Sequence, residues 1–245
     1  GPMPDDESVL DRASAPLDDV VRWGDSADAV ADVRHGDPAR PLVVLIHGGF
    51  WRPAYDRVHV RATTEGLNAE GWTVAAPEYR RVPGDPDATT SDVASALAAL
   101  PSLLADHHDG RVVVLGHSAG GHLALWAAAA APAPGLVLTV SLGGVGSLAL
   151  AEADDLGSGA VGAFLGGRAS SRPALDPALL PTPFSQVRLV HGAEDDIVPV
   201  SQARAYAAAH HRARVEEVAG CGHFGVIDPM ADAWHAVVGA VRGAP

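Results

Sequence analysis

Lysine is missing from this sequence, and cysteine occurs only once. All 17 basic residues are arginines, which excludes a lysine Schiff base and a phosphate-binding loop built on lysine. The lone Cys221 cannot form a disulfide within the chain, and without a second cysteine it cannot build a thiolate metal cluster. A single free cysteine is typical of a reducing compartment, so we expect a cytoplasmic protein with no metal or other cofactor.

Apolar runs long enough to span a membrane are also missing, because the longest ones are interrupted by glycine or proline. Acidic residues outnumber basic ones by 30 to 17, for a formal net charge of -13. A chain this acidic, with no block of arginine, repels nucleic acids and anionic membranes. We therefore expect a small-molecule partner rather than nucleic acid or a membrane, and the sequence leaves a homodimer open.

Short apolar runs alternate with alanine-rich segments of helical character along most of the chain. The runs predicted as strands cover residues 41–46, 72–76, 111–115, 135–142, 186–190 and 214–218. The predicted helices cover residues 57–70, 89–105, 118–131, 200–211 and 230–242. Regular alternation of this kind predicts an α/β fold, with a mostly parallel twisted sheet and helices on both of its faces.

Three further segments complete the predicted organisation. Residues 20–23 and 29–33 are typical of an antiparallel hairpin at the edge of the sheet. Residues 143–185, rich in Gly, Ala, Ser and Pro, interrupt the rhythm and predict a small cap over the active site. Residues 1–16 are expected to be flexible and to begin with a protease-cleavage scar, Gly1-Pro2-Met3, which leaves one domain over residues 17–245.

The segment Gly116-His117-Ser118-Ala119-Gly120 lies between a buried strand and a helix. A serine at such a turn is held in a strained backbone conformation, and small neighbours are needed where chain segments crowd together. The start of the helix presents backbone N–H groups where negative charge develops during acyl transfer. Position and composition together predict a nucleophile elbow with Ser118 as the nucleophile.

A serine nucleophile needs a base within reach and a third group that orients the base. Carboxylates follow the strand at 186–190, and His223 follows the next strand in a Gly-rich loop. The chain order Ser, acid, His is the order that an elbow of this kind uses. By position alone, Asp195, Glu194 and Asp196 are all candidates for the acid.

Two glycines, Gly48 and Gly49, follow the first long strand. Glycine lets the backbone approach a substrate closely, so this loop can donate N–H groups to an oxyanion. His47 and His191 each precede a glycine at the end of a strand, and we expect a structural hydrogen bond for each of them.

At this point the sequence resembles known families. His47-Gly48-Gly49-Phe50-Trp51 is similar to the H-G-G-x-W motif of kynurenine formamidases, and residues 116–121 resemble the G-H-S-A-G-G elbow shared with hormone-sensitive-lipase-type esterases. Residues 77–80 resemble the Y-R segment of both groups. Residues 191–199 resemble the H-G-x-x-D-x-x-V-P acid loop, and residues 222–224 the G-H-F base loop. The resemblance spans about residues 40–230 and implies the α/β-hydrolase fold.

The resemblance also implies roles for single residues. It makes Ser118, Asp195 and His223 the catalytic triad, with Asp195 preferred over its neighbours because it lies four residues after His191 and four before Pro199. The implied oxyanion-hole donors are backbone N–H groups, those of Gly49, Phe50 and Ala119.

Trp51 and His117 are placed on the substrate pocket. The chain departs from the formamidase pattern at Phe50, where Tyr is common, and at Arg81, where an apolar residue is usual. We therefore expect the substrate pocket to differ from that of the formamidases.

The predicted function is a serine hydrolase that cleaves a small ester or amide through an acyl-enzyme, in the manner of an arylformamidase. A general carboxylesterase is the nearest alternative. An acylaminoacyl-type peptidase shares the serine elbow but usually carries a large extra domain, for which this chain has no room. A non-catalytic binding protein on the same fold is the alternative from another class.

Overall fold

The structure, a computed structural model, describes residues 5–245. The expected cleavage scar at residues 1–3 lies outside the described residues. Within residues 5–245, no helix has the length and apolar character needed to cross a membrane.

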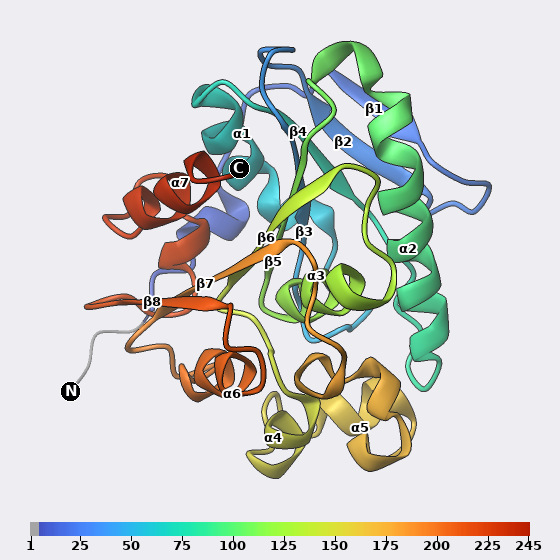
Figure 1. The fold of residues 1–245 in the computed structure, drawn as a ribbon, viewed down its shortest axis with the longest axis vertical. Coiled ribbons are helices and arrows are strands. Elements are labelled where there is room, and N and C mark those ends of the chain that lie inside the picture. Colours follow the sequence, from blue (N-terminus) through green and yellow to red (C-terminus); the bar gives the residue numbers. More distant parts are fainter. Residues whose placement is uncertain (1–4) are drawn as a thin grey trace.

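Eight strands form a single sheet in the order β1-β2-β4-β3-β5-β6-β7-β8 (Figure 1). The strands are β1 Asp19–Arg22, β2 Val30–Arg34, β3 Leu42–Ile46, β4 Thr73–Pro77, β5 Val112–His117, β6 Leu136–Leu142, β7 Gln186–Gly192 and β8 Arg214–Val218. β1 and β2 pair antiparallel, as do β2 and β4, and the remaining pairs are parallel. The predicted mostly parallel sheet and the edge hairpin are both confirmed.

Helices cover both faces of the sheet, with α2 on one side and α1 and α7 on the other in Figure 1. The helices are α1 Arg61–Ala69, α2 Pro86–Leu103, α3 Ala119–Ala130, α4 Leu148–Ala153, α5 Ala160–Leu165, α6 Ser201–Ala209 and α7 Trp234–Arg242. Short 3-10 turns are Ser8–Asp11, Arg57–Val60, Ala105–His107, Ala169–Ser171, Pro173–Leu175, Pro177–Leu179 and Gly225–Ile227.

The central strands are largely apolar, and β3 is wholly so, because each of their faces is buried under helices. In β3, Leu42, Val44 and Ile46 pack into the cluster beneath α2 and α3. The alternate residues Val43 and Leu45 pack into the cluster beneath α1 and α7. The carboxyl ends of these parallel strands lie along one edge, which is where open α/β sheets place their sites.

Three predicted helices begin several residues away from the expected position. α1 begins at Arg61, because residues 57–60, predicted as its start, form a 3-10 turn. α2 begins at Pro86, three residues before the predicted start, because the Asp85 side chain accepts a hydrogen bond from the backbone N–H of Ala88 and proline suits the first helical position. α7 begins at Trp234 rather than at residue 230.

The insert between β6 and β7 consists of α4, α5 and three of the 3-10 turns, and α4 and α5 lie together at one end of the molecule in Figure 1. It packs on the loop that follows β3: the ring of Phe164 stacks on Trp51 with 4.6 Å between centroids, and Arg52 donates a hydrogen bond to the carbonyl oxygen of Gly157. The insert therefore packs against the loop after β3 and stabilises it.

The described part of the N-terminal segment, expected to be flexible, packs against the domain instead. Val9 is 1% exposed and belongs to the core cluster under α1 and α7. Arg12 donates hydrogen bonds of 2.6 and 3.1 Å to the two carboxylate oxygens of Asp228. The burial of Val9 and the bidentate pair of Arg12 with Asp228 both stabilise this packing.

Because α3 lies so close to β3, we predict that position 120 tolerates only glycine. A Cβ atom at this position would lie 2.1 Å from the carbonyl oxygen of Ile46, which is backbone and cannot move aside. We expect Gly120→Ala to lower the free energy of unfolding by about 3 kcal/mol or more.

The matched control is Gly239→Ala in α7, where a Cβ atom would meet nothing within 4 Å. This change should raise the free energy of unfolding by about 1 kcal/mol, because alanine favours a helix over glycine. Urea unfolding of both variants measures the difference. Equal effects of the two changes would contradict the proposed close packing.

Candidate active site

Ser118 lies at the turn between β5 and α3, with φ 59° and ψ −119°. This region of backbone space is strained for a residue other than glycine. The turn is tight because a Cβ atom on Gly116 would lie 1.9 Å from the carbonyl oxygen of Gly120. The Ser118 N–H donates to the Leu142 carbonyl, and the Ser118 carbonyl accepts from the N–H of Val145, which locks the turn onto the end of β6.

Asp195 follows β7 and His223 follows β8, and the two side chains meet. The distance from Nδ1 of His223 to Oδ2 of Asp195 is 2.7 Å, and both residues are buried. The other oxygen of Asp195 accepts hydrogen bonds from the N–H groups of Ile197 at 3.0 Å and Val198 at 2.8 Å. These three donors fix the carboxylate and direct Nδ1 of the imidazole toward it.

The two other candidate acids do not share this position. Glu194 and Asp196 are exposed, and neither contacts His223 among the residues that the structure describes. The geometry therefore separates Asp195 from neighbours that sequence position could not exclude.

Ser118 and His223 line the same cavity. Within residues 5–245, neither the Ser118 hydroxyl nor Nε2 of His223 makes a hydrogen bond. The two groups are therefore not hydrogen-bonded to each other in this structure. Catalytic hydrogen bonds commonly tighten only when substrate is bound. Both side chains therefore line one cavity, and the Ser118 hydroxyl and Nε2 of His223 have no hydrogen-bond partner among residues 5–245.

Gly143, at the end of β6, lies against the Asp–His pair, and sequence reasoning did not single it out. Its φ is +54°, and a Cβ atom there would lie 3.2 Å from Oδ2 of Asp195 and 3.5 Å from Nδ1 of His223. The signal available in the sequence was a pair of glycines directly after the strand at 135–142.

Two buried histidines tie the loops of the site together. The Nε2 atom of His117 lies 2.9 Å from the carbonyl oxygen of His223, and that of His191 lies 2.7 Å from the carbonyl oxygen of Val198. Burial lowers the pKa of His117 to about 3 and lowers that of His191. Both are neutral near pH 7, each donates from Nε2, and the expected structural hydrogen bond of His191 is present.

The loop after β3 turns through three left-handed residues: φ is +118° at Gly49, 50° at Phe50 and 59° at Trp51. A Cβ atom on Gly48 would lie 2.9 Å from Cβ of Ser118, so this loop lies directly against the turn that carries Ser118. Among the described residues, nothing accepts a hydrogen bond from the N–H groups of the expected oxyanion donors, which are Gly49, Phe50 and Ala119.

A buried hydrogen bond between a histidine and a carboxylate anchors the start of this loop. Nε2 of His47 lies 2.6 Å from Oε1 of Glu78, and the second oxygen of Glu78 accepts from the N–H of Arg57 at 2.9 Å. Burial alone would raise the pKa of Glu78, but the hydrogen bond and charge of His47 outweigh it and bring the pKa to about 2. The Tyr79 hydroxyl donates to the His47 carbonyl at 2.6 Å, so the resemblance segment at residues 77–80 supports the loop.

Trp51, predicted to line the substrate pocket, lies elsewhere. It is 3% exposed, its indole N–H donates to Nδ1 of His122 at 3.1 Å, and its ring stacks on Phe164 of the insert. Trp51 therefore connects the loop after β3 to α3, through His122, and to the insert, through Phe164. The motif predicted this tryptophan on the pocket, but a motif does not indicate how deeply a side chain is buried.

The cavity at Ser118 has a volume of about 230 Å³. Its lining is mostly apolar and includes His117, which was predicted to line the pocket. The lining residues are Glu7, Leu10, His47, Gly48, Gly49, Phe50, Tyr55, His59, Val60, His117, Ser118, Ile197, His223, Phe224 and Ile227. No residue of the insert at 143–185 contributes to this lining. The cap over the site therefore stays a prediction, and the described N-terminal segment supplies part of the wall of this cavity.

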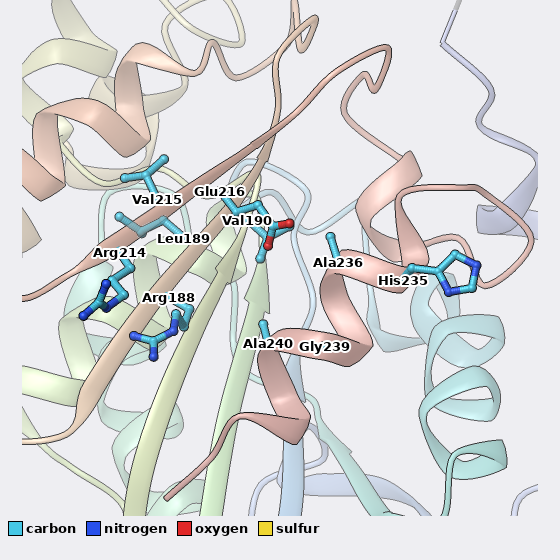
Figure 2. Close-up of a pocket in the computed structure, with 10 residues that line it drawn as sticks. All are labelled: Arg188, Leu189, Val190, Arg214, Val215, Glu216, His235, Ala236, Gly239 and Ala240. Carbon is cyan, nitrogen blue, oxygen red and sulfur yellow. The ribbon is translucent and has the colours of Figure 1, made fainter.

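A larger hollow of about 360 Å³ lies between α7 and the strands β7 and β8 (Figure 2). Arg188 and Arg214 lie side by side at one end of it, where β7 and β8 pair. None of the predicted site residues lines this hollow, and we assign the chemistry to the smaller cavity because the strained serine and the Asp–His pair are there.

Comparison with known proteins supports the fold. A family model described as BD-FAE matches residues 31–136, which include the Gly49 loop and Ser118 but not Asp195 or His223. The sequence matches none of the curated proteins with which it was compared.

Solved structures of esterases are similar across nearly the whole chain. Esterase B from Lactobacillus rhamnosis is 19% identical with a TM-score of 0.77, covering 96% of this chain and 88% of that one. Thermogutta terrifontis esterase 2, phosphonylated by sarin, is 18% identical with a TM-score of 0.71, covering 90% and 91%. A truncated carbohydrate esterase from gut microbiota is 16% identical with a TM-score of 0.75, covering 91% and 94%. These likenesses show the α/β-hydrolase fold that the resemblance implied.

His122 provides a pH test of the packing behind the loop. Burial lowers its pKa to about 4, against about 6.5 in an unfolded chain. The unfolded state therefore binds the proton more tightly, and stability present above pH 6.5 is lost as pH falls toward 4. Between pH 7 and pH 5 this one group should remove about 2 kcal/mol of the free energy of unfolding.

The His122→Gln variant cannot take up this proton, and its loss between pH 7 and pH 5 should be smaller than that of the unchanged protein by the same amount. His235→Gln, at an exposed position of α7, is the matched control and should leave the pH dependence unchanged. Urea unfolding at the two pH values measures both. An unaltered pH dependence in His122→Gln would show that this histidine does not lie buried and neutral.

Proposed function

We propose that this protein is a serine hydrolase that cleaves small, largely apolar esters through an acyl-enzyme. The observation that carries the proposal is the meeting of the Asp195–His223 pair, 2.7 Å apart, with a strained Ser118 on one cavity. A protein that only binds a ligand has no need of an oriented imidazole beside a strained hydroxyl. The esterases among the similar folds support the same class.

In the proposed reaction, the Ser118 hydroxyl attacks the ester carbonyl while Nε2 of His223 takes its proton. Asp195, fixed by two backbone donors, keeps Nδ1–H directed at its carboxylate and stabilises the imidazolium that forms. The imidazolium then protonates the leaving alkoxide. Water, deprotonated by the same imidazole, releases the acid and restores the serine.

The oxyanion that forms during each step needs donors that are already in place. The N–H groups of Gly49, Phe50 and Ala119 are unoccupied and lie where the loop after β3 meets the nucleophile turn. A donor of this kind contributes about 3 to 4 kcal/mol to the transition state. The anchored His47–Glu78 pair keeps the loop in its left-handed course before substrate arrives.

We expect Ser118→Ala to lower kcat/KM for p-nitrophenyl acetate by a factor on the order of 10⁴ to 10⁶, because the nucleophile is lost. Asp195→Asn should lower kcat by about 10⁴, because the amide favours the wrong imidazole tautomer. Asp196→Asn is the matched control and should keep nearly full activity. Full activity in Ser118→Ala would reject the proposal, and a larger loss in Asp196→Asn than in Asp195→Asn would reassign the acid.

The finer alternative is an arylformamidase, which the H-G-G-x-W resemblance suggests. Its tryptophan packs in the core here, so the motif matches this chain at a residue that does not line the cavity. We therefore favour the ester. Turnover of p-nitrophenyl acetate should exceed that of N-formylkynurenine at equal concentration, and a large excess in the opposite direction would replace the ester by the formamide.

A further inference from the structure

The N-terminal segment reaches the base of the proposed triad. The Asp5 carboxylate accepts hydrogen bonds from the backbone N–H of His223 at 2.5 Å and from that of Phe224 at 3.3 Å, through the same oxygen. A Cβ atom on Gly222 would lie 2.7 Å from Cγ of Asp5, so the carboxylate fits against a glycine. Asp5 thus contacts the base loop at three consecutive residues, which lie 217 to 219 positions away in the chain.

Two residues that follow Asp5 anchor the segment further. Val9 fills a position in the core, and Arg12 pairs with Asp228, which follows the 3-10 turn Gly225–Ile227 after the base loop. Residues 5–12 therefore contact the loop that carries His223 at residues 222–224 and again just beyond it at Asp228. A hydrogen bond with a charged partner is worth more than a neutral one, and a loop tied at several points loses freedom to tilt its imidazole.

The same segment supplies part of the cavity wall. Leu10 and Glu7 line the cavity together with Ser118 and His223, whereas Asp5 does not line it. Glu7 is the one acidic residue in the lining, and its side chain is exposed and makes no hydrogen bond within residues 5–245. A ligand in the cavity therefore meets an apolar side chain and a carboxylate from this segment.

We propose that residues 5–12 belong to the active site. In this proposal, Asp5 is a positioning residue for His223. Leu10 and Glu7 select esters whose acyl group is uncharged over esters whose acyl group carries a carboxylate. This inference rests on the proposed hydrolase function. Asp5 acts through the backbone of the base loop, so its loss should affect the chemical step. Leu10 and Glu7 face the substrate, so their loss should affect which substrate is bound.

The first experiment compares Asp5→Ala, Asp5→Asn and Asp6→Asn in the full chain. Asp6 is an exposed neighbour whose side chain contacts Ser8 rather than the base loop, which makes it the matched control. For p-nitrophenyl butyrate, Asp5→Ala should lower kcat by about 10- to 100-fold with little change in KM, since a slightly misplaced base costs this much. Asp5→Asn retains an acceptor oxygen and should recover most of kcat.

The second experiment tests the wall. Leu10→Ala should raise KM for p-nitrophenyl butyrate several-fold and leave kcat near its original value. Glu7→Gln should raise kcat/KM for 4-nitrophenyl hemisuccinate, relative to the butyrate, by about two- to fivefold, the size expected for an exposed charge pair. Unchanged KM in Leu10→Ala and an unchanged ratio in Glu7→Gln would overturn the selective role of the segment.

A third measurement does not depend on activity. Hydrogen exchange of the amides of His223 and Phe224 should be faster in Asp5→Ala than in the unchanged protein, and not in Asp6→Asn. If kcat or the exchange rate of Asp5→Ala equals that of the unchanged protein, the positioning role of Asp5 is overturned. The proposed hydrolase function still holds in that case, provided that the unchanged protein is active. A parent protein with no esterase activity would overturn the hydrolase, and the exchange rates would still decide whether Asp5 fixes the loop.

Discussion

The close approach of backbone to backbone around Ser118 is the constraint on which the site depends. Gly116 and Gly120 leave no room for a side chain, and Gly48 brings the loop after β3 against the same turn. Only glycine permits contacts of this kind, since any Cβ atom would meet a carbonyl oxygen or the serine itself. The crowding holds the serine in a strained conformation and, by the same contact, places free N–H groups beside it.

Around this turn, buried polar groups fix the loops without competing for the reaction. His117, His122 and His191 have lowered pKa values because they are buried, so near neutral pH each is a directed hydrogen-bond partner rather than a charge. Each has its Nε2 atom on a backbone carbonyl. His223 differs, because its Nδ1 contacts a carboxylate and its Nε2 remains without a partner among the described residues. This difference in contacts separates the proposed base from the structural histidines.

The features that the sequence predicted best are those that depend on residues close together in the chain. The alternation of strands and helices and the glycines around Ser118 are local patterns, and the sheet and the tight turn follow from them. Position alone left three neighbouring carboxylates as candidates for the acid, and the family resemblance preferred Asp195. The fold shows that Asp195 is buried while Glu194 and Asp196 are exposed. Three features depend on packing between distant segments, for which no local pattern exists. They are the burial of Trp51 away from the cavity, the position of the insert and the contact of Asp5 with His223.

The most direct test of this account is to react the protein with a fluorophosphonate and locate the adduct by mass spectrometry. The account predicts one stoichiometric adduct, on Ser118, and its disappearance in His223→Ala, because the hydroxyl is activated only by the adjacent imidazole. An adduct on another residue, or no adduct in a folded protein, would contradict it.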